Sequence, residues 1–143
     1  MAEVPGLTKR CLAIQQGKSH SYHKVIQYHY TNWPDFGVPK SPKPLVDLVK
    51  IVREELASKG GVCVVHCSAG VGRTGTMIAL NKIIEEIDNE TEDIDIFRIV
   101  LLLRTDRMFM VQKPAQYNFL YACTAYYLTY GGMQTMEGCR PCE

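Results

Sequence analysis

A cysteine and an arginine six residues apart, on one short glycine-containing loop, are the residues of this 143-residue chain best suited to chemistry. The loop follows an apolar run at 62–65 and precedes an apolar periodic segment from Thr76, so we expect it to join a buried strand to a helix. Backbone N–H groups at such a junction bind anions, and the same field lowers the pKa of Cys67 toward a thiolate. Arg73 adds a planar guanidinium that fits two phosphate oxygens. This combination predicts phosphoryl transfer through a cysteinyl-phosphate intermediate.

The complete loop, 66–75, resembles the signature of the protein tyrosine phosphatases, which is His-Cys, five residues and Arg. It reads His-Cys-Ser-Ala-Gly-Val-Gly-Arg-Thr-Gly. A Cys–Arg pair alone often arises by chance, and Cys67 alone could be a small buried side chain beside an ordinary turn. The whole decapeptide, between a predicted strand and a predicted helix, outweighs that alternative. The resemblance implies that phosphate is bound by Ser68, Ala69, Gly70, Val71, Gly72 and Arg73.

A second segment, 30–39, resembles the mobile loop that carries the general acid in this family. The resemblance implies that Asp35 protonates the leaving phenolate and then deprotonates the attacking water. Trp33 would anchor this loop as a hinge, and Pro34 would help to fix its turns. Trp-Pro-Asp alone is an ordinary loop sequence, so its place ahead of the cysteine loop is what favours the catalytic interpretation.

A third segment, 110–117, resembles the family's glutamine loop. The resemblance implies that Gln112 positions the hydrolytic water and that Gln116 assists. Two glutamines four residues apart are otherwise typical of a solvated helix face. Beside the nucleophile, His66 is interpreted as a support for the loop, and the Thr74 hydroxyl as a donor that stabilises the thiolate as a leaving group.

The composition is that of a small globular protein, with 46% hydrophobic residues and a net charge of +1. A charge so close to zero argues against binding nucleic acid or a membrane surface by bulk charge, and no apolar run reaches the length of a membrane span. The six cysteines show no paired metal-ligand spacing beyond Cys139 and Cys142, so no metal or cofactor is expected. A catalytic thiol needs a reducing compartment, which predicts a cytoplasmic location.

The pattern of elements predicts one α/β domain over 1–143, with a central mixed sheet flanked by helices and a tail at 131–143. Strands are expected at 22–30 and 62–65, with 10–14 as a candidate third. Helices are expected from 41–44 to about 58, and over 76–88, 94–103 and 114–130. Five residues recur at helical spacing in the last helix and favour a buried face: Tyr117, Leu120, Tyr121, Thr124 and Leu128.

The resemblance covers about 22–130 and corresponds to the C-terminal half of the family's domain. The sheet is therefore expected to be incomplete on its N-terminal side, and the missing half of the domain is an expected partner. The family's loop with a tyrosine that stacks on phosphotyrosine has no counterpart here. Phe109 is a smaller departure, because it stands where the family commonly has a glycine.

Three functions compete on this evidence. The first is an active tyrosine-specific phosphatase that acts on phosphotyrosine-containing proteins, and it is favoured because every residue needed for both chemical steps is present. The second is a catalytically impaired phosphotyrosine-binding or regulatory fragment. The third is a dual-specificity phosphatase, which would explain the short chain. The Ser-Ala-Gly-Val-Gly filling of the loop, the Trp-Pro-Asp segment and Gln112 argue against this third function.

Overall fold

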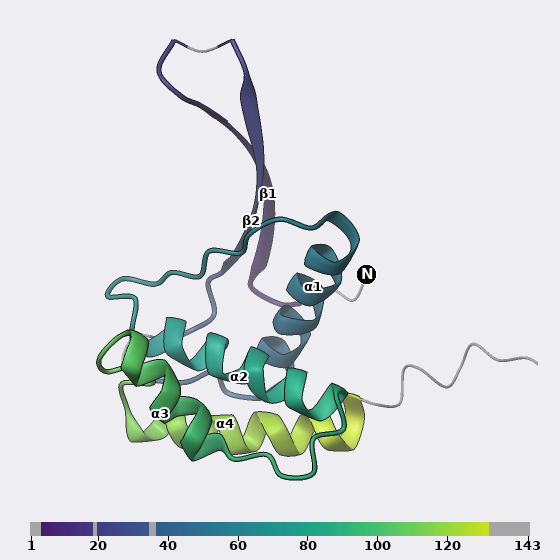
Figure 1. Ribbon diagram of the computed structural model, residues 1–143, viewed down its shortest axis with the longest axis vertical. Coiled ribbons are helices and arrows are strands. Elements are labelled where there is room, and N and C mark those ends of the chain that lie inside the picture. The colour runs from purple at the N-terminus through teal and green to yellow at the C-terminus, as the bar shows by residue number, and fades with distance from the viewer. Residues whose placement is uncertain (1–3, 19, 35–36, 132–143) are drawn as a thin grey trace, which may run out of the picture.

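The structure, a computed structural model, describes residues 4–18, 20–34 and 37–131. Within these ranges it contains a two-stranded antiparallel sheet and four α-helices, so the predicted α/β class is confirmed. The elements are β1 (Leu7–Gln15), β2 (Tyr22–Tyr30), α1 (Lys43–Lys59), α2 (Gly72–Asp88), α3 (Ile96–Asp106), α4 (Pro114–Tyr126) and a π-helical turn (Tyr127–Gly131). The helices form one body from which the hairpin projects (Figure 1). Apart from Gly131, the predicted tail lies outside the described residues.

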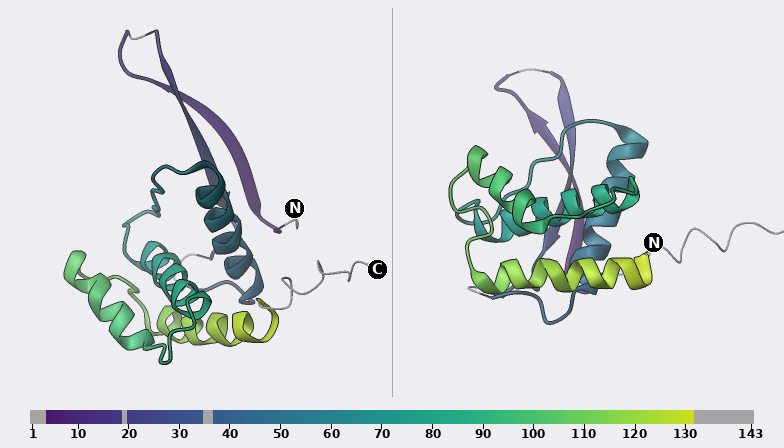
Figure 2. Two further views of the ribbon diagram at one scale, coloured as in Figure 1. Left: turned by 45° about the vertical axis from the view of Figure 1, so that its right-hand side comes forward. Right: turned by 60° about the horizontal axis from the view of Figure 1, so that its bottom comes forward.

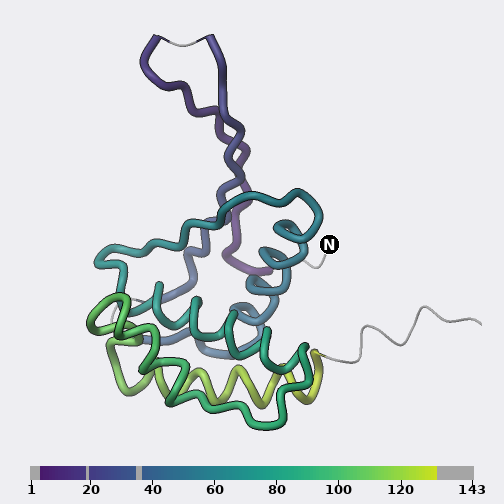
Figure 3. Tube along the Cα trace, viewed as in Figure 1, coloured from purple at the N-terminus to yellow at the C-terminus, as the bar shows by residue number. Residues whose placement is uncertain are grey.

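The hairpin of β1 and β2 pairs without a break from Leu7–Tyr30 to Gln15–Tyr22. The boundaries predicted for β2 are confirmed, and β1 extends beyond the predicted 10–14 at both ends. The two strands wind around each other along the hairpin (Figure 3), as the right-handed twist of β-strands requires. Both views in Figure 2 place most of the hairpin outside the helical body. Only its base is covered, where Tyr28 and other residues pack against the core.

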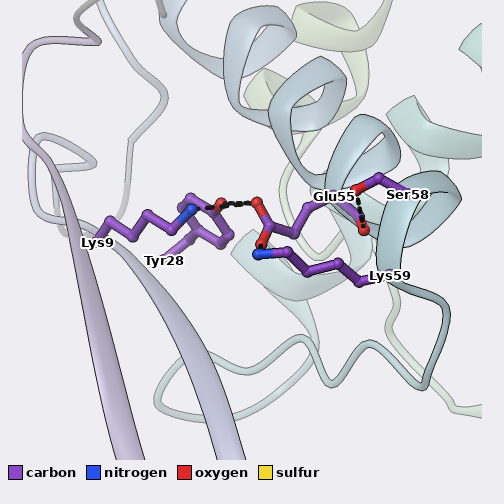
Figure 4. A network of polar contacts seen from close by, with 5 residues as sticks. All are labelled: Lys9, Tyr28, Glu55, Ser58 and Lys59. Carbon is purple, nitrogen blue, oxygen red and sulfur yellow. Dashed lines mark hydrogen bonds and ion pairs between the residues drawn. The ribbon is translucent and has the colours of Figure 1, made fainter.

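A polar network joins the base of the hairpin to α1 (Figure 4). Tyr28 Oη donates to Glu55 Oε2 at 2.8 Å, and Lys9 Nζ donates to the same oxygen at 3.1 Å. Lys59, one turn further along α1, pairs with the other carboxylate oxygen. The hydrogen bond from Lys59, followed by those from Tyr28 and Lys9, lowers the pKa of Glu55 to about 2.

The core lies between the helices, with α2 contacting α1, α3 and α4. Pro44 lies in the first turn of α1, where its missing N–H costs nothing, and Asp95 Oδ1 caps α3 by accepting from Arg98 N at 2.9 Å. None of the helices in the described ranges is long and apolar enough to cross a membrane. The largest fully buried apolar side chains are Leu45, Val46, Val49, Leu80, Ile83, Ile84, Val111, Leu120 and Cys123.

The prediction of a buried strand at 62–65 is wrong. Residues 60–67 have no regular secondary structure, and the side chains of Val62 and Val64 are 91% and 81% exposed. A central strand needs neighbours on both edges, whereas the strands of the described chain, β1 and β2, pair only with each other. The apolar sequence is typical of a strand covered on both faces, but the described chain supplies no cover.

The buried face predicted for the last helix is also partly wrong. Leu120 and Thr124 are buried, but Tyr121 and Leu128 are 49% and 60% exposed. The helix instead buries an adjacent face, which includes Phe119, Cys123 and the following Tyr127. Apolar and aromatic residues lie on both faces of α4, so helical spacing alone could not select the face that meets α2.

Candidate active site

The cysteine loop ends directly on the N-terminus of α2. This helix begins at Gly72 rather than at Thr76, so Arg73 and Thr74 lie in its first turn, and Gly75 N donates to Val71 O at 3.1 Å. The first N–H groups of a helix have no partner within it, and the helix dipole places positive charge at this end. This end of the loop can therefore bind an anion.

Cys67 lies at the entrance of this loop, with its sulfur turned toward the helix. The N–H of Gly70 donates to Cys67 Sγ at 3.2 Å, and Gly70 has φ +70°, a conformation that favours glycine. Burial is the largest single influence and by itself raises the pKa of the thiol. Hydrogen bonding from the Thr74 side chain and from the backbone of Thr74, Gly70 and Val71 outweighs it and lowers the pKa of Cys67 to about 7. The lowered pKa therefore places part of the Cys67 population in the thiolate form at neutral pH.

Thr74 lies beside the sulfur, as its effect on the pKa of Cys67 requires. Its Oγ1 is buried and completes no hydrogen bond of ordinary geometry within the described chain. The hydroxyl therefore lies close to the sulfur without a complete hydrogen bond. A buried hydroxyl without an acceptor costs about 1–3 kcal/mol. An anion in the loop, or a small shift of the sulfur, would supply the acceptor.

Arg73 folds back across the loop. Its Nη2 donates to Ser68 Oγ at 3.1 Å, which joins the first and last parts of the loop. The imidazole of His66 is exposed, with Nδ1 at 3.4 Å from Cys67 O. Of the predicted loop residues, the structure thus brings Gly70, Val71 and Thr74 to the sulfur and joins Arg73 to Ser68.

The glutamine loop packs against the first turn of α2. A Cβ added to Gly72 would lie 3.0 Å from Gln116 Nε2 and 3.4 Å from Gln112 Oε1. Gln112 is exposed, whereas Gln116 is buried and caps α4 by accepting from Lys113 N at 3.1 Å. The solvated-face interpretation therefore fails for Gln116, and both predicted glutamines lie at the cysteine loop.

Two residues ahead of Gln112 adopt left-handed backbone conformations, Phe109 with φ +65° and Val111 with φ +59°. Such conformations cost residues other than glycine about 1–3 kcal/mol. This cost is a physical reason for the glycine that the family commonly has at the position of Phe109. Val111 N donates to Val71 O at 3.1 Å, and the Arg104 guanidinium donates to Met110 O and Val111 O at 3.0 Å each. The bond to Val71 holds the strained turn against the cysteine loop, and the Arg104 bonds hold it to α3.

The segment predicted to carry the general acid is only partly described. Asp35 lies outside the described residues, so its role stays a prediction. Trp33 is buried in the core, and its Nε1 donates to Gly37 O at 3.0 Å, while Gly37 N donates to Pro34 O at 3.3 Å. These contacts join the two described ends of the segment and are compatible with the predicted anchoring role of Trp33.

Sequence reasoning missed one residue of this site. Arg107, which follows α3, donates from Nη2 to Ala69 O at 3.0 Å. Nothing in the sequence distinguishes Arg107 from the other basic residues, because its hydrogen-bond partner, Ala69, lies 38 residues earlier in the chain.

Comparison with known proteins identifies the family of this chain. The family model described as protein-tyrosine phosphatase matches residues 2–126, and the chain belongs to that family. Receptor-type tyrosine-protein phosphatase V of Rattus norvegicus is 41% identical over 118 residues, which are 81% of this chain and 7% of that protein. Receptor-type tyrosine-protein phosphatase epsilon of Mus musculus is 44% identical over 107 residues, 75% of this chain and 15% of that protein.

A third relative has a different name. Phosphatidylinositol phosphatase PTPRQ of Homo sapiens is 48% identical over 99 residues, 69% of this chain and 4% of that protein. The chain thus spans at most 15% of the length of these three relatives.

Proposed function

We propose that residues 1–143 are part of the catalytic domain of a tyrosine-specific phosphatase, which hydrolyses phosphotyrosine in proteins through a cysteinyl-phosphate. The observation that carries this proposal is the Cys67 sulfur, which accepts the Gly70 N–H at the amino end of α2 and has a pKa lowered to about 7. A thiolate in this position can attack phosphorus while the helix terminus binds the phosphate oxygens. A thiolate of this kind needs a reducing environment, which supports a cytoplasmic location.

In the first step, Cys67 Sγ attacks phosphorus in line with the phenolate oxygen, so that the S–P bond forms as the P–O bond breaks. Asp35 gives its proton to the leaving oxygen. Arg73 and the loop N–H groups stabilise the charge on the three equatorial oxygens.

In the second step, water displaces the sulfur. Gln112 positions this water and Asp35 removes its proton, so that an O–P bond forms and the S–P bond breaks. The Thr74 hydroxyl stabilises the departing thiolate. The buried, incompletely bonded Oγ1 supports this role, because a fully charged sulfur offers it an acceptor.

The decisive experiment compares Cys67→Ser with Cys63→Ser on an aryl phosphate. Cys63 is an exposed free cysteine and provides a matched control. We expect Cys67→Ser to abolish phosphate release, because a serine hydroxyl stays protonated in this field, and Cys63→Ser to keep wild-type turnover. A phosphorylated cysteine trapped by acid quench and located by mass spectrometry would identify the intermediate.

Several results would overturn the proposal. Normal turnover by Cys67→Ser would exclude the cysteinyl-phosphate. Vanadate binding by the wild-type chain without phosphate release would favour the impaired binding fragment. Equal hydrolysis of phosphoserine and phosphotyrosine peptides would favour a dual-specificity enzyme. Preference for phosphatidylinositol phosphates over phosphotyrosine peptides would instead favour a lipid phosphatase, which is the activity that the name of the third relative states.

A further inference from the structure

The peptide group between Ala69 and Gly70 is held at both of its ends. Its N–H donates to Cys67 Sγ at 3.2 Å, and its carbonyl oxygen accepts from Arg107 Nη2 at 3.0 Å. The N–H and C=O of a trans peptide point in opposite directions. A contact that fixes the carbonyl on one side therefore fixes the N–H on the sulfur at the other side.

This peptide group needs an external contact to stay in place. Gly70 has φ +70°, and glycine permits the neighbouring peptide to rotate with little steric cost. Arg107 covers this residue, because a Cβ added to Gly70 would lie 3.5 Å from Arg107 Nη2. The guanidinium is thus the group on the far side of the peptide that opposes such a rotation.

We propose that Arg107 is a positioning residue that holds the 69–70 peptide with its N–H directed at the Cys67 sulfur, and thereby keeps the nucleophile in its thiolate form. A cation on the carbonyl oxygen also polarises the peptide and strengthens its N–H as a donor. The consequence for catalysis rests on the proposed function. The test measures the thiol itself, so its failure is distinguishable from a failure of the proposed phosphatase activity.

The experiment follows the alkylation of Cys67 by iodoacetamide as a function of pH, in the variants Arg107→Ala and Arg107→Lys. The other reactive cysteines are first replaced by serine. Cys123 stays, because burial raises its pKa to about 12 and keeps it unreactive. The matched control is Arg98→Ala, which removes an exposed arginine from the first turn of α3. The remaining charged or titratable groups of the loop, Arg73 and His66, are unchanged in every variant. The replaced cysteines are Cys11, Cys63, Cys139 and Cys142.

We expect Arg107→Ala to raise the pKa of Cys67 by about one unit, which is a tenfold change in the protonation equilibrium. Arg107→Lys should give a smaller rise, because lysine keeps the charge but lacks the planar fork. Arg98→Ala should give no rise. Circular dichroism melting checks that each variant is folded, and Arg107→Lys carries the test if Arg107→Ala does not fold.

Salt separates positioning from simple charge attraction. In about 1 M salt the Debye length falls to about 3 Å, so a shift caused only by the distant positive charge would largely vanish. A shift caused by loss of the peptide orientation should persist. An unchanged pKa in the Arg107 variants, or a shift that disappears in high salt, would overturn the proposal.

Discussion

The hairpin and the cysteine loop are held by opposite kinds of contact. In the hairpin, β1 and β2 satisfy each other along their whole length, yet apolar side chains near its tip, such as Ile14 and Tyr22, are 52% and 62% exposed. The cysteine loop has no ladder at all, but residues distant in the sequence hold it, among them Arg107 and Val111. A complete strand ladder therefore does not show that a segment of this molecule packs against the helical body.

The comparison also shows where the support of the candidate site comes from. The contacts to the loop arise from α2, from the end of α3 and from the turn before α4, all of which follow it in the chain. The preceding segment, 60–67, contributes no regular structure. The site is thus organised from its C-terminal side, whereas the hairpin is joined to the body through α1.

The largest effect is expected at the predicted general acid. Asp35 follows β2 in the chain, and Asp35→Ala should lower kcat roughly 10²–10⁴-fold with little change in KM, as for loss of a general acid. Arg73→Ala should lower kcat and also raise KM, because the guanidinium contacts phosphate in the ground state and the transition state. Steady-state kinetics of both variants check this, and identical profiles would contradict the two roles.

Two glycine substitutions, one in each region, test the comparison and are expected to have effects of intermediate size. A Cβ on Gly75 would lie 2.4 Å from Val111 N, so Gly75→Ala must push the glutamine loop away from the cysteine loop. We expect a loss of about 3 kcal/mol in the free energy of unfolding, together with loss of activity. Gly17, at the hairpin tip, has φ +56° and open space around it, so Gly17→Ala should cost only about 1 kcal/mol.

Urea unfolding and aryl phosphate turnover measure both glycine variants. Gly17→Ala is expected to keep wild-type activity because the described part of the hairpin's far end lies away from the helical body (Figure 1), and a Cβ on Gly17 would meet nothing within 4 Å. If Gly75→Ala stays fully active, the close contact between the two loops is not needed for the site.

The smallest effect is expected where the hairpin meets α1. The pKa of Glu55 is lowered to about 2, so its contribution to stability is present above the ordinary pKa of glutamate and is lost as the pH falls from about 4.5 toward 2. Glu55→Gln should remove this part of the acid dependence, whereas Glu54→Gln, an exposed neighbour, should not. Amide hydrogen exchange of β1 and β2 at neutral and acid pH checks it, and equal behaviour of the two variants would contradict it.

The elements that the sequence predicted well are those whose signals are local. β-forming residues marked β2, apolar spacing with proline at the start marked α1, and an apolar run marked α3, although the Asp95 cap starts this helix at Ile96 rather than at residue 94. The start of α2 at Gly72 was not predicted because Gly72 and Gly75 disfavour a helix interior. Their lack of a side chain makes room for the glutamine loop.

The features that could not be predicted depend on partners distant in the sequence. The apolar residues at 62–65 indicate that this segment is suited to burial. They do not indicate whether a neighbouring strand is present to cover it. Arg107 carries no local mark of its contact with Ala69. The cysteine loop itself was recognisable because its whole motif is contiguous, and the role of Asp35 stays a prediction.

The exposed connection ahead of the cysteine loop has one more consequence. Val62 and Val64 stand almost fully in solvent within an uncharged run rich in β-branched residues. Such a run forms cross-β contacts readily when it is not covered. The behaviour of this chain in solution should therefore depend on its concentration. Dilute samples would preserve the site, and concentrated samples would lose it to aggregates that begin a few residues from the nucleophile.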